Sequence, residues 1–353
     1  MPQDFVQGER EQLHPKASED TPRVPNAFGI TAGLQALSLG PLLILVVLIL
    51  GVSVITPSFL RPINLGNILA QTAVIAIVAM GQQLVILTRG IDLSVGSNLA
   101  LATVAGGLVF QQTGSAPIVV LAIVVSGAVV GAINGFVFVY GKLPHPFIIT
   151  LATLSVCRGL ALELAPGHTT MRGMPDWIAA LGGNSTFGVP HSFFVVLAVI
   201  LVLFIMTRTM VWGRWIYAVG GAPDAARGMG IPVRGVLLST YIISGICAGI
   251  GAVVLAGRTA AASPLYGNLL ELDTIAAVII GGASFLGGRG HIGHALIGAV
   301  LIGVIRNALN LLGVDVFFQM IAIGLVIVVA VEADVLRNYL EGRARVIQSA
   351  RTQ

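Results

Sequence analysis

Ten long apolar stretches dominate this sequence and leave little room for any fold other than a bundle of membrane-crossing helices. A helix needs about 20 largely apolar residues to cross the hydrocarbon core of a bilayer. The third, sixth and eighth stretches are short, and we expect them to be tilted, broken or only partly spanning. We therefore predict an all-α polytopic membrane protein with about ten transmembrane helices, at residues 39–55, 68–87, 95–110, 118–140, 147–164, 189–206, 236–256, 272–286, 292–311 and 316–331.

The composition agrees with a membrane protein and argues against a soluble one. Of the 353 residues, 56% are hydrophobic and only 10% are charged, whereas about a quarter of the residues of a soluble domain are charged. The 44 glycines fit closely packed transmembrane helices, because small residues let helix backbones approach. Cys157 and Cys247 both lie within apolar stretches, so no disulfide framework is expected.

The basic residues indicate how the chain is oriented in the membrane. When the N-terminus is placed inside, most lysines and arginines fall in cytoplasmic tails and connections. Arg61, Arg172 and Arg258 fall in outer connections, while Arg158 and Arg306 lie within spans. The positive-inside rule predicts this asymmetry, so both termini are expected in the cytoplasm. The net charge of +4 then reflects membrane orientation, and no nucleic-acid partner is expected.

The predicted organisation has three parts. Residues 1–36 are polar, contain proline and carry both signs of charge, so they are expected to be a disordered cytoplasmic tail. Residues 37–333 form the transmembrane domain, with a polar cytoplasmic loop at 208–235, and residues 334–353 form a cytoplasmic C-terminal tail. The longest outer connection, 165–190, is expected to carry a short helix around 175–181.

Within the cytoplasmic loop, a short helix is predicted from its two ends. Pro223 suits a first helical position, Asp224 is favoured in the first turn by the helix dipole, and Gly230 can adopt the left-handed closing conformation. A helix of about seven residues is too short to be stable alone in water, so we expect it to dock on a motor subunit and transmit force to the bundle. The candidate coupling residues are Gly220, Gly221, Pro223, Asp224, Ala225, Ala226, Arg227 and Gly230.

The sequence contains no recognisable nucleotide, metal or catalytic site. A phosphate loop requires G-x-x-x-x-G-K-[ST], but Lys16 follows Pro15 and Lys142 precedes Leu143. His291 and His294 are three residues apart and have no third candidate ligand nearby in the sequence. We therefore expect neither an enzyme nor a bound cofactor.

Polar residues in and beside the spans are the candidates for a translocation path. Residues 88–97 read T-R-G-I-D-L-S-V-G-S, in which Asp92 and Ser94 can cap the following helix. One interpretation is that this turn lines the inner gate; the other is a capped cytoplasmic turn in which Arg89 and Asp92 are neighbours. Asn98, Asn307 and Asn310 lie within spans and either face the path or form hydrogen bonds between helices.

Charged residues near the outer ends of the spans form a second group of candidates. Arg258, Glu271 and Asp273 are predicted at the periplasmic mouth, where they bind a partner protein or sugar hydroxyls; the alternative is an interfacial ion pair. Arg158 falls near the middle of its span, where a cation costs about 3 kcal/mol on insertion scales. It needs a partner, and we expect that partner on another helix.

Taken together, several motifs resemble one known family. These are G-I-D-L-S-V-G-S at 90–97, F-I-I-T-L-A-T at 147–153 followed by R-G-L-A at 158–161, E-L-D at 271–273 followed by G-G at 281–282 and G-G-R-G at 287–290, and N-L-L-G at 310–313. Over nearly all of residues 55–331 the chain resembles the permease subunits of bacterial ATP-binding-cassette importers for monosaccharides, the ribose type. Asp224, Ala225, Ala226 and Gly230 are similar to the E-A-A-x-x-x-G core of the loop that contacts the ATPase in such permeases, with Asp in place of Glu, and Thr240 stands where the longer form of that motif has a different residue.

The resemblance implies an importer permease fold in the bacterial inner membrane and a mechanism of alternating access. It also implies the partners, which are an ATP-binding cassette subunit, often in tandem form, a periplasmic sugar-binding protein and a second permease copy. Two alternatives stay open. The same architecture serves furanose signals, polyols, nucleosides or amino acids, and a secondary transporter would use an acidic residue at the membrane midplane.

Overall fold

The computed structural model describes residues 27–165, 167 and 169–351. It is all-helical apart from four two-residue strands among the described residues. Seven helices within this part of the chain are long and apolar enough to cross a membrane. They are α2 (Pro62–Leu87), α4 (Ala116–Tyr140), α5 (Phe147–Leu164), α7 (His191–Arg208), α10 (Val233–Thr259), α12 (Ile292–Leu311) and the Val316–Leu336 part of α13 (Val316–Arg351).

Each of the three other predicted spans also contains a helix, but these helices differ from full spans. The apolar part of α1 (Ala27–Ile55) covers Gly40–Ile55, and α3 (Val95–Thr113) has 19 residues, most of them buried. The eighth predicted span, 272–286, is only partly helical, because α11 (Leu270–Ile280) ends at a turn. Its 11 residues extend about 16 Å, roughly half of a bilayer core. The coarse prediction of a helical membrane protein is therefore confirmed.

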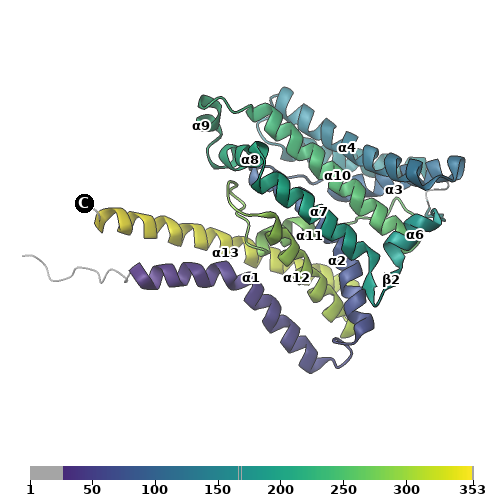
Figure 1. Cartoon of the computed structure of the whole chain (residues 1–353), viewed down its shortest axis with the longest axis horizontal. Helices are drawn as coiled ribbons and strands as arrows, with labels where there is room; N and C mark the ends of the chain where they lie inside the picture. Colours follow the sequence, from purple (N-terminus) through teal and green to yellow (C-terminus); the bar gives the residue numbers. More distant parts are fainter. Residues whose placement is uncertain (1–26, 166, 168, 352–353) are drawn as a thin grey trace, which may run out of the picture.

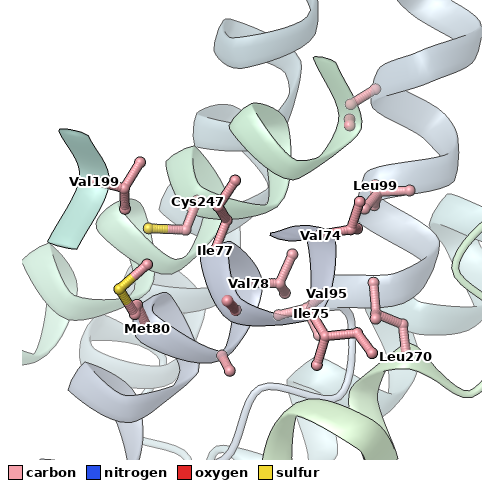
Figure 2. Packing of buried hydrophobic residues seen from close by; sticks show 14 of the residues in the cluster. Val74, Ile75, Ile77, Val78, Met80, Val95, Leu99, Val199, Cys247 and Leu270 are labelled. Atoms are coloured by element: carbon pink, nitrogen blue, oxygen red, sulfur yellow. The ribbon is translucent and has the colours of Figure 1, made fainter. Parts of the chain in front are cut away.

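Helix α2 lies at the centre of the bundle, and its middle residues are buried on all sides. Figure 2 shows Val74, Ile77, Val78 and Met80 of α2 among side chains from four other helices. Uniform burial explains why α2 is apolar around its whole circumference, as expected for a helix without a solvent or lipid face. The surrounding side chains in that view are Val95 and Leu99 of α3, Val199 of α7, Cys247 of α10 and Leu270 of α11.

Among the described residues, α4 and α10 form the most extensive contact between two helices, and glycines make its short separation possible. A Cβ added to Gly127 would lie 2.4 Å from the carbonyl oxygen of Gly245, and one added to Gly131 would lie 2.2 Å from that of Tyr241. Within membranes, helix association depends on such close backbone packing because lipid tails provide little hydrophobic drive. The glycines at four-residue intervals therefore specify which faces of α4 and α10 meet.

The two ends of the bundle carry different small elements (Figure 1). At one end, α8 (Val211–Gly221) and α9 (Pro223–Gly228) lie on the same side as the start of α1 and the end of α13. At the opposite end lie α6 (Asp176–Gly183), the pair β1 (Met171–Arg172) with β4 (Ala261–Ala262), and the hairpin β2 (Ser185–Thr186) with β3 (Val189–Pro190). The short helix expected around 175–181 is confirmed as α6.

The predicted tails fall partly on described residues. The first ten residues of α1 from Ala27 lie within the stretch 1–36 that we predicted as a tail, and residues 1–26 lie outside the described part of the chain. The predicted C-terminal tail begins at 334, but α13 continues as one helix to Arg351. The helical pattern at both termini thus extends beyond the apolar segments that sequence reasoning used to set the boundaries.

Candidate functional site

The short cytoplasmic helix predicted around Pro223 is present as α9. Pro223 occupies its first turn with Asp224, and Gly230 has a φ of 80°, the left-handed conformation expected at the close of the helix. The N–H of Ile231 bonds to the carbonyl of Ala226 at 3.1 Å, which completes this turn. Only Ala226 of α9 is buried, so the rest of the helix is available to a partner.

The other residues predicted to act in coupling lie on both sides of α9. Gly220 is buried and Gly221 is exposed at the end of α8, and Ala225 and Arg227 lie on the exposed surface of α9. Arg227 and Asp224 form a surface ion pair at 3.1 Å. Such exposed pairs contribute little to stability, so Asp224 is not required to hold the local fold.

Most of the turn predicted at the inner gate, here residues 88–94, lies inside the bundle, and only Arg89 of these residues is exposed. After α2 ends at Leu87 the chain turns back along α2, and the Gln82 side-chain amide, in the orientation that satisfies both of its groups, bonds to the backbone N–H and carbonyl of Asp92 at 3.1 and 3.2 Å. The Asp92 carboxylate is 1% exposed. It accepts hydrogen bonds from Ser94 N at 3.0 Å, Ser94 Oγ at 2.7 Å, Asn134 Nδ2 at 3.4 Å and Ser244 Oγ at 3.2 Å.

This arrangement holds the start of α3 between α4, α5 and α10. Asn134 also donates to Ser94 Oγ at 2.8 Å and accepts from Thr153 Oγ1 of α5 at 2.7 Å. Ser94 is the N-cap residue of α3, but its side chain makes no capping bond; its hydroxyl donates to Asp92 and accepts from Asn134 instead. The alternative of an Arg89–Asp92 neighbour pair is not observed: Arg89 donates instead to the carbonyls of Gly220 and Gly221.

The connection that the sequence places on the outer side, residues 260–269, runs back along α3 from the other end of the bundle. Ala262 lies against Gly107, and the carbonyl of Ser263 accepts a hydrogen bond from Thr103 Oγ1 at 3.4 Å. Gly267 meets Gly96 at the start of α3 so closely that a Cβ on either would lie within 2.3 Å of the other's carbonyl oxygen. Turn 88–94 and connection 260–269 therefore meet at the N-terminus of α3.

Arg158 of α5 finds its partner in this outer connection. Its Nη1 donates to the carbonyl of Tyr266 at 2.9 Å and also to that of Pro264. The acceptors of these hydrogen bonds belong to the loop backbone and not to another helix, but a counter-charge does lie on another helix, α11, as expected. Glu271 is half-buried beside Gly96 and interacts electrostatically with Arg158.

The residues predicted at the periplasmic mouth are not gathered on one surface. Arg258 is exposed in the last turn of α10. Asp273 is buried and forms an ion pair with Arg306 of α12, whose Nη2 lies 2.7 and 2.6 Å from the two carboxylate oxygens. Sequence reasoning noted Arg306 as a cation within a span but did not identify this partner.

The candidate asparagines connect helices. Asn98 Nδ2 donates to the carbonyl of Gly127 at 3.1 Å. Asn307 and Asn64 exchange two hydrogen bonds of 2.9 Å between α12 and α2. Asn310 accepts from Gln319 of α13 at 2.8 Å. Sequence reasoning missed Asn134 and Ser244, whose only signal was a polar residue within an apolar helix, and it gave no role to Thr153, which lies in the motif at 147–153.

Comparison with known proteins gives a consistent result. The family model described as "Branched-chain amino acid transport system / permease component" matches residues 64–331. A ribose import permease protein of Bacillus subtilis is 41% identical over 302 residues, covering 84% of this chain and 92% of that protein. A D-allose transport system permease protein of Escherichia coli is 39% identical (78% and 84% covered), and a fructose import permease protein of Rhizobium meliloti is 36% identical (83% and 84% covered). No solved structure matches the chain.

Proposed function

Because the chain belongs to the family of branched-chain amino acid transport system permease components, we propose that it carries a monosaccharide of the ribose type across the bacterial inner membrane. It is a multi-pass permease subunit of an ATP-binding-cassette importer and does not itself catalyse a reaction. The observation that carries the choice of sugar is the 41% identity over 302 residues with a ribose import permease. Import of D-allose and fructose by other relatives supports a small sugar as the substrate class.

The partners that we propose follow from two features of the chain, the lack of a phosphate loop in its sequence and the exposed surface of α9. Because the chain has no phosphate loop, an ATPase subunit, in tandem form or as two copies, hydrolyses the ATP. We assign α9 to the groove of that subunit, because Asp224, Ala225 and Arg227 of α9 are exposed at one end of the bundle. A periplasmic binding protein delivers the sugar at the other end, and a second permease copy completes the path by alternating access.

The proposed topology has ten membrane segments with both termini in the cytoplasm. The start of α1, the end of α13 and α9 lie at one end of the bundle, which supports this orientation, as does the distribution of basic residues. In this topology α11 crosses only part of the bilayer. Irregular backbone at membrane depth is tolerated where protein buries it. Residues 90–94 of the turn and residues 261–264 of the connection, which are buried or half-buried, meet that condition.

We propose that some of the candidate path residues position α3 at the inner gate and that the others hold α12 beside the path. Asp92, Ser94 and Asn98 fix the N-terminus of α3 at the inner gate by their hydrogen bonds. Asn307 and Asn310 hold α12 against α2 and α13 at the edge of the path. Weak sugar binding by the permease is expected, because specificity then resides in the binding protein.

The substrate proposal is tested by reconstitution. The chain is placed in proteoliposomes with the ATPase and binding protein encoded beside its gene, and uptake of labelled ribose, allose, fructose and leucine is measured. ATP-dependent ribose uptake that requires both partners is the expected result. Uptake of leucine without uptake of any sugar would show that the substrate is an amino acid. Uphill transport by the chain without its partners would show that it is a secondary transporter and not an importer subunit.

Two substitutions in and beside α9 are expected to abolish ATP-dependent uptake while the protein still reaches the membrane. Asp224→Lys reverses the charge of an exposed side chain, and Gly230→Val forces a β-branched residue into a left-handed conformation that only glycine adopts without strain. Uptake and membrane content are measured in the same vesicles. Gly324→Val on the exposed face of α13 is the control, because its added side chain meets open space. Unimpaired uptake in both α9 variants would remove the coupling assignment.

Arg258→Glu is expected to weaken docking of the sugar-loaded binding protein. Arg258 is exposed at the end of α10, opposite α9, so its charge is available to a partner. The measurement is the concentration of binding protein that gives half-maximal stimulation of ATP hydrolysis, which should rise at low salt and converge with the wild-type value at high salt. An unchanged concentration would contradict a role of Arg258 in docking the binding protein.

A further inference from the structure

Arg89 connects the turn after α2 to the end of α8. Its guanidinium Nε donates to the carbonyl of Gly220 at 2.6 Å, and its Nη2 donates to that of Gly221 at 2.5 Å. These are the last two residues of α8, and only Ala222 separates them from α9. The final carbonyls of a helix have no partner within it and carry partial negative charge. A fixed, two-pronged cation is therefore well matched to this helix end.

A second set of contacts surrounds this bond. The N–H of Gly288, in the connection between α11 and α12, donates to the carbonyl of Leu87 at 2.9 Å. A Cβ on Gly220 would lie 1.8 Å from the Leu87 carbonyl oxygen, and one on Gly287 would lie 2.5 Å from Arg89 Cγ. We name residues 87–89, 220–221 and 287–288 the glycine junction. Because backbone meets backbone there, the junction resists compression, but this packing alone does not hold α8 to the turn when the two move apart.

The glycine junction continues directly into the bundle interior. Gly90, the residue after Arg89 in turn 88–94, is already buried, and Asp92 is fixed inside the bundle by Ser94, Asn134 and Ser244. The same turn leads into α3, whose Gly96 touches Gly267 of the outer connection. One continuous set of contacts thus joins the last two residues of α8 to the connection 260–269.

We propose that Arg89 is a positioning residue through which a movement of α9 reaches turn 88–94. The inference rests on the proposed role of α9 as the contact for the ATPase. Displacing α9 displaces Gly220 and Gly221, and the bidentate bond from Arg89 makes the turn follow. Without the guanidinium, α8 and α9 move while the turn stays in place, so ATP hydrolysis and transport become uncoupled.

The first test measures coupling in the full complex in proteoliposomes. In Arg89→Met the guanidinium is removed and the aliphatic stem is kept. We expect ATP hydrolysis to continue and ribose uptake per ATP hydrolysed to fall about tenfold, within the range typical of coupling between two sites. Arg89→Lys keeps a cation but loses the two-pronged geometry, so its ratio should lie between those of Arg89→Met and the wild type. Lys142→Met is the control, because Lys142 is an exposed cation in the connection between α4 and α5, and it should leave the ratio unchanged.

The second test measures whether the accessibility of turn 88–94 changes with the nucleotide state. Leu93 is partly buried in turn 88–94, and both native cysteines are buried, so Leu93→Cys supplies the reporter thiol. In the otherwise wild-type complex, the rate of labelling by a small thiol reagent is expected to differ between the nucleotide-free and vanadate-trapped states. In the Arg89→Met background this difference should disappear. A structural role alone would lower stability but would keep the nucleotide-dependent difference.

The outcomes separate the two proposals. An unchanged uptake-to-ATP ratio, or a nucleotide-dependent labelling difference that persists in Arg89→Met, would overturn the role of Arg89 and leave the importer proposal intact. Absence of ATP-dependent uptake in the wild-type complex would instead refute the proposed function. If Arg89→Met does not assemble, Arg89→Lys decides, because a ratio equal to the wild-type value would contradict the proposal.

Discussion

Replacing Gly131 by leucine is expected to prevent the protein from accumulating as a folded membrane protein. Even the Cβ of a new side chain would lie 2.2 Å from the carbonyl oxygen of Tyr241 and 3.1 Å from Gly245 Cα. These are backbone atoms of α10, so they cannot rotate away, and α4 and α10 would have to separate along their length. Overpacking a core typically costs about 1–3 kcal/mol, and we expect this substitution to reach or exceed that upper value. The measurement is the yield of monodisperse protein after detergent extraction, together with its thermal midpoint.

The matched control for this substitution is Gly324→Leu in α13. Gly324 is also a glycine within a candidate span, but it is exposed and an added Cβ meets nothing within 4 Å. Its leucine should therefore leave yield and thermal midpoint close to wild type. Gly131→Ala should fall between the two leucine variants. Equal yields for Gly131→Leu and Gly324→Leu would mean that α4 and α10 do not pack through this face.

The α4–α10 contact shows which parts of the fold can be predicted from this sequence and which cannot. The apolar stretches predicted the positions of the helices, because length and hydropathy are local properties of the chain. The many glycines predicted close packing, but the choice of partner for Gly127 and Gly131 depends on residues more than 100 positions away. A single sequence carries no signal for that pairing, so the order of helices in the bundle could not be predicted.

Turn 88–94 shows the same limit for the candidate site. Its polar residues lie between two apolar stretches, which is the pattern of an exposed connection, and a cytoplasmic turn with a neighbouring Arg89 and Asp92 was one reasonable interpretation. The structure buries Asp92 because Asn134 and Ser244, on two other helices, satisfy its carboxylate. The helix α9, by contrast, was predictable, since Pro223 and Gly230 mark its ends through local backbone preferences.

Arg306→Leu is expected to destabilise the protein strongly, more than Asp273→Leu does. Removing Arg306 leaves a buried carboxylate without its counter-charge, and breaking a buried pair in this way typically costs about 3–5 kcal/mol. Asp273 is the more buried partner, with a side chain 6% exposed against 35% for Arg306. An arginine left alone by Asp273→Leu can therefore turn its head towards water, as long basic side chains do, and should cost less.

The double variant Asp273→Leu/Arg306→Leu separates pairing from function. Replacing a buried ion pair by apolar residues is often close to neutral, so the double variant should regain much of the thermal midpoint lost in Arg306→Leu, and the two effects should not add. Additive losses would mean that the two residues act independently. If the double variant is stable but does not transport, the charge pair is needed while the permease moves, because an apolar pair between α11 and α12 cannot break and re-form with the strong directionality of a carboxylate–guanidinium bond.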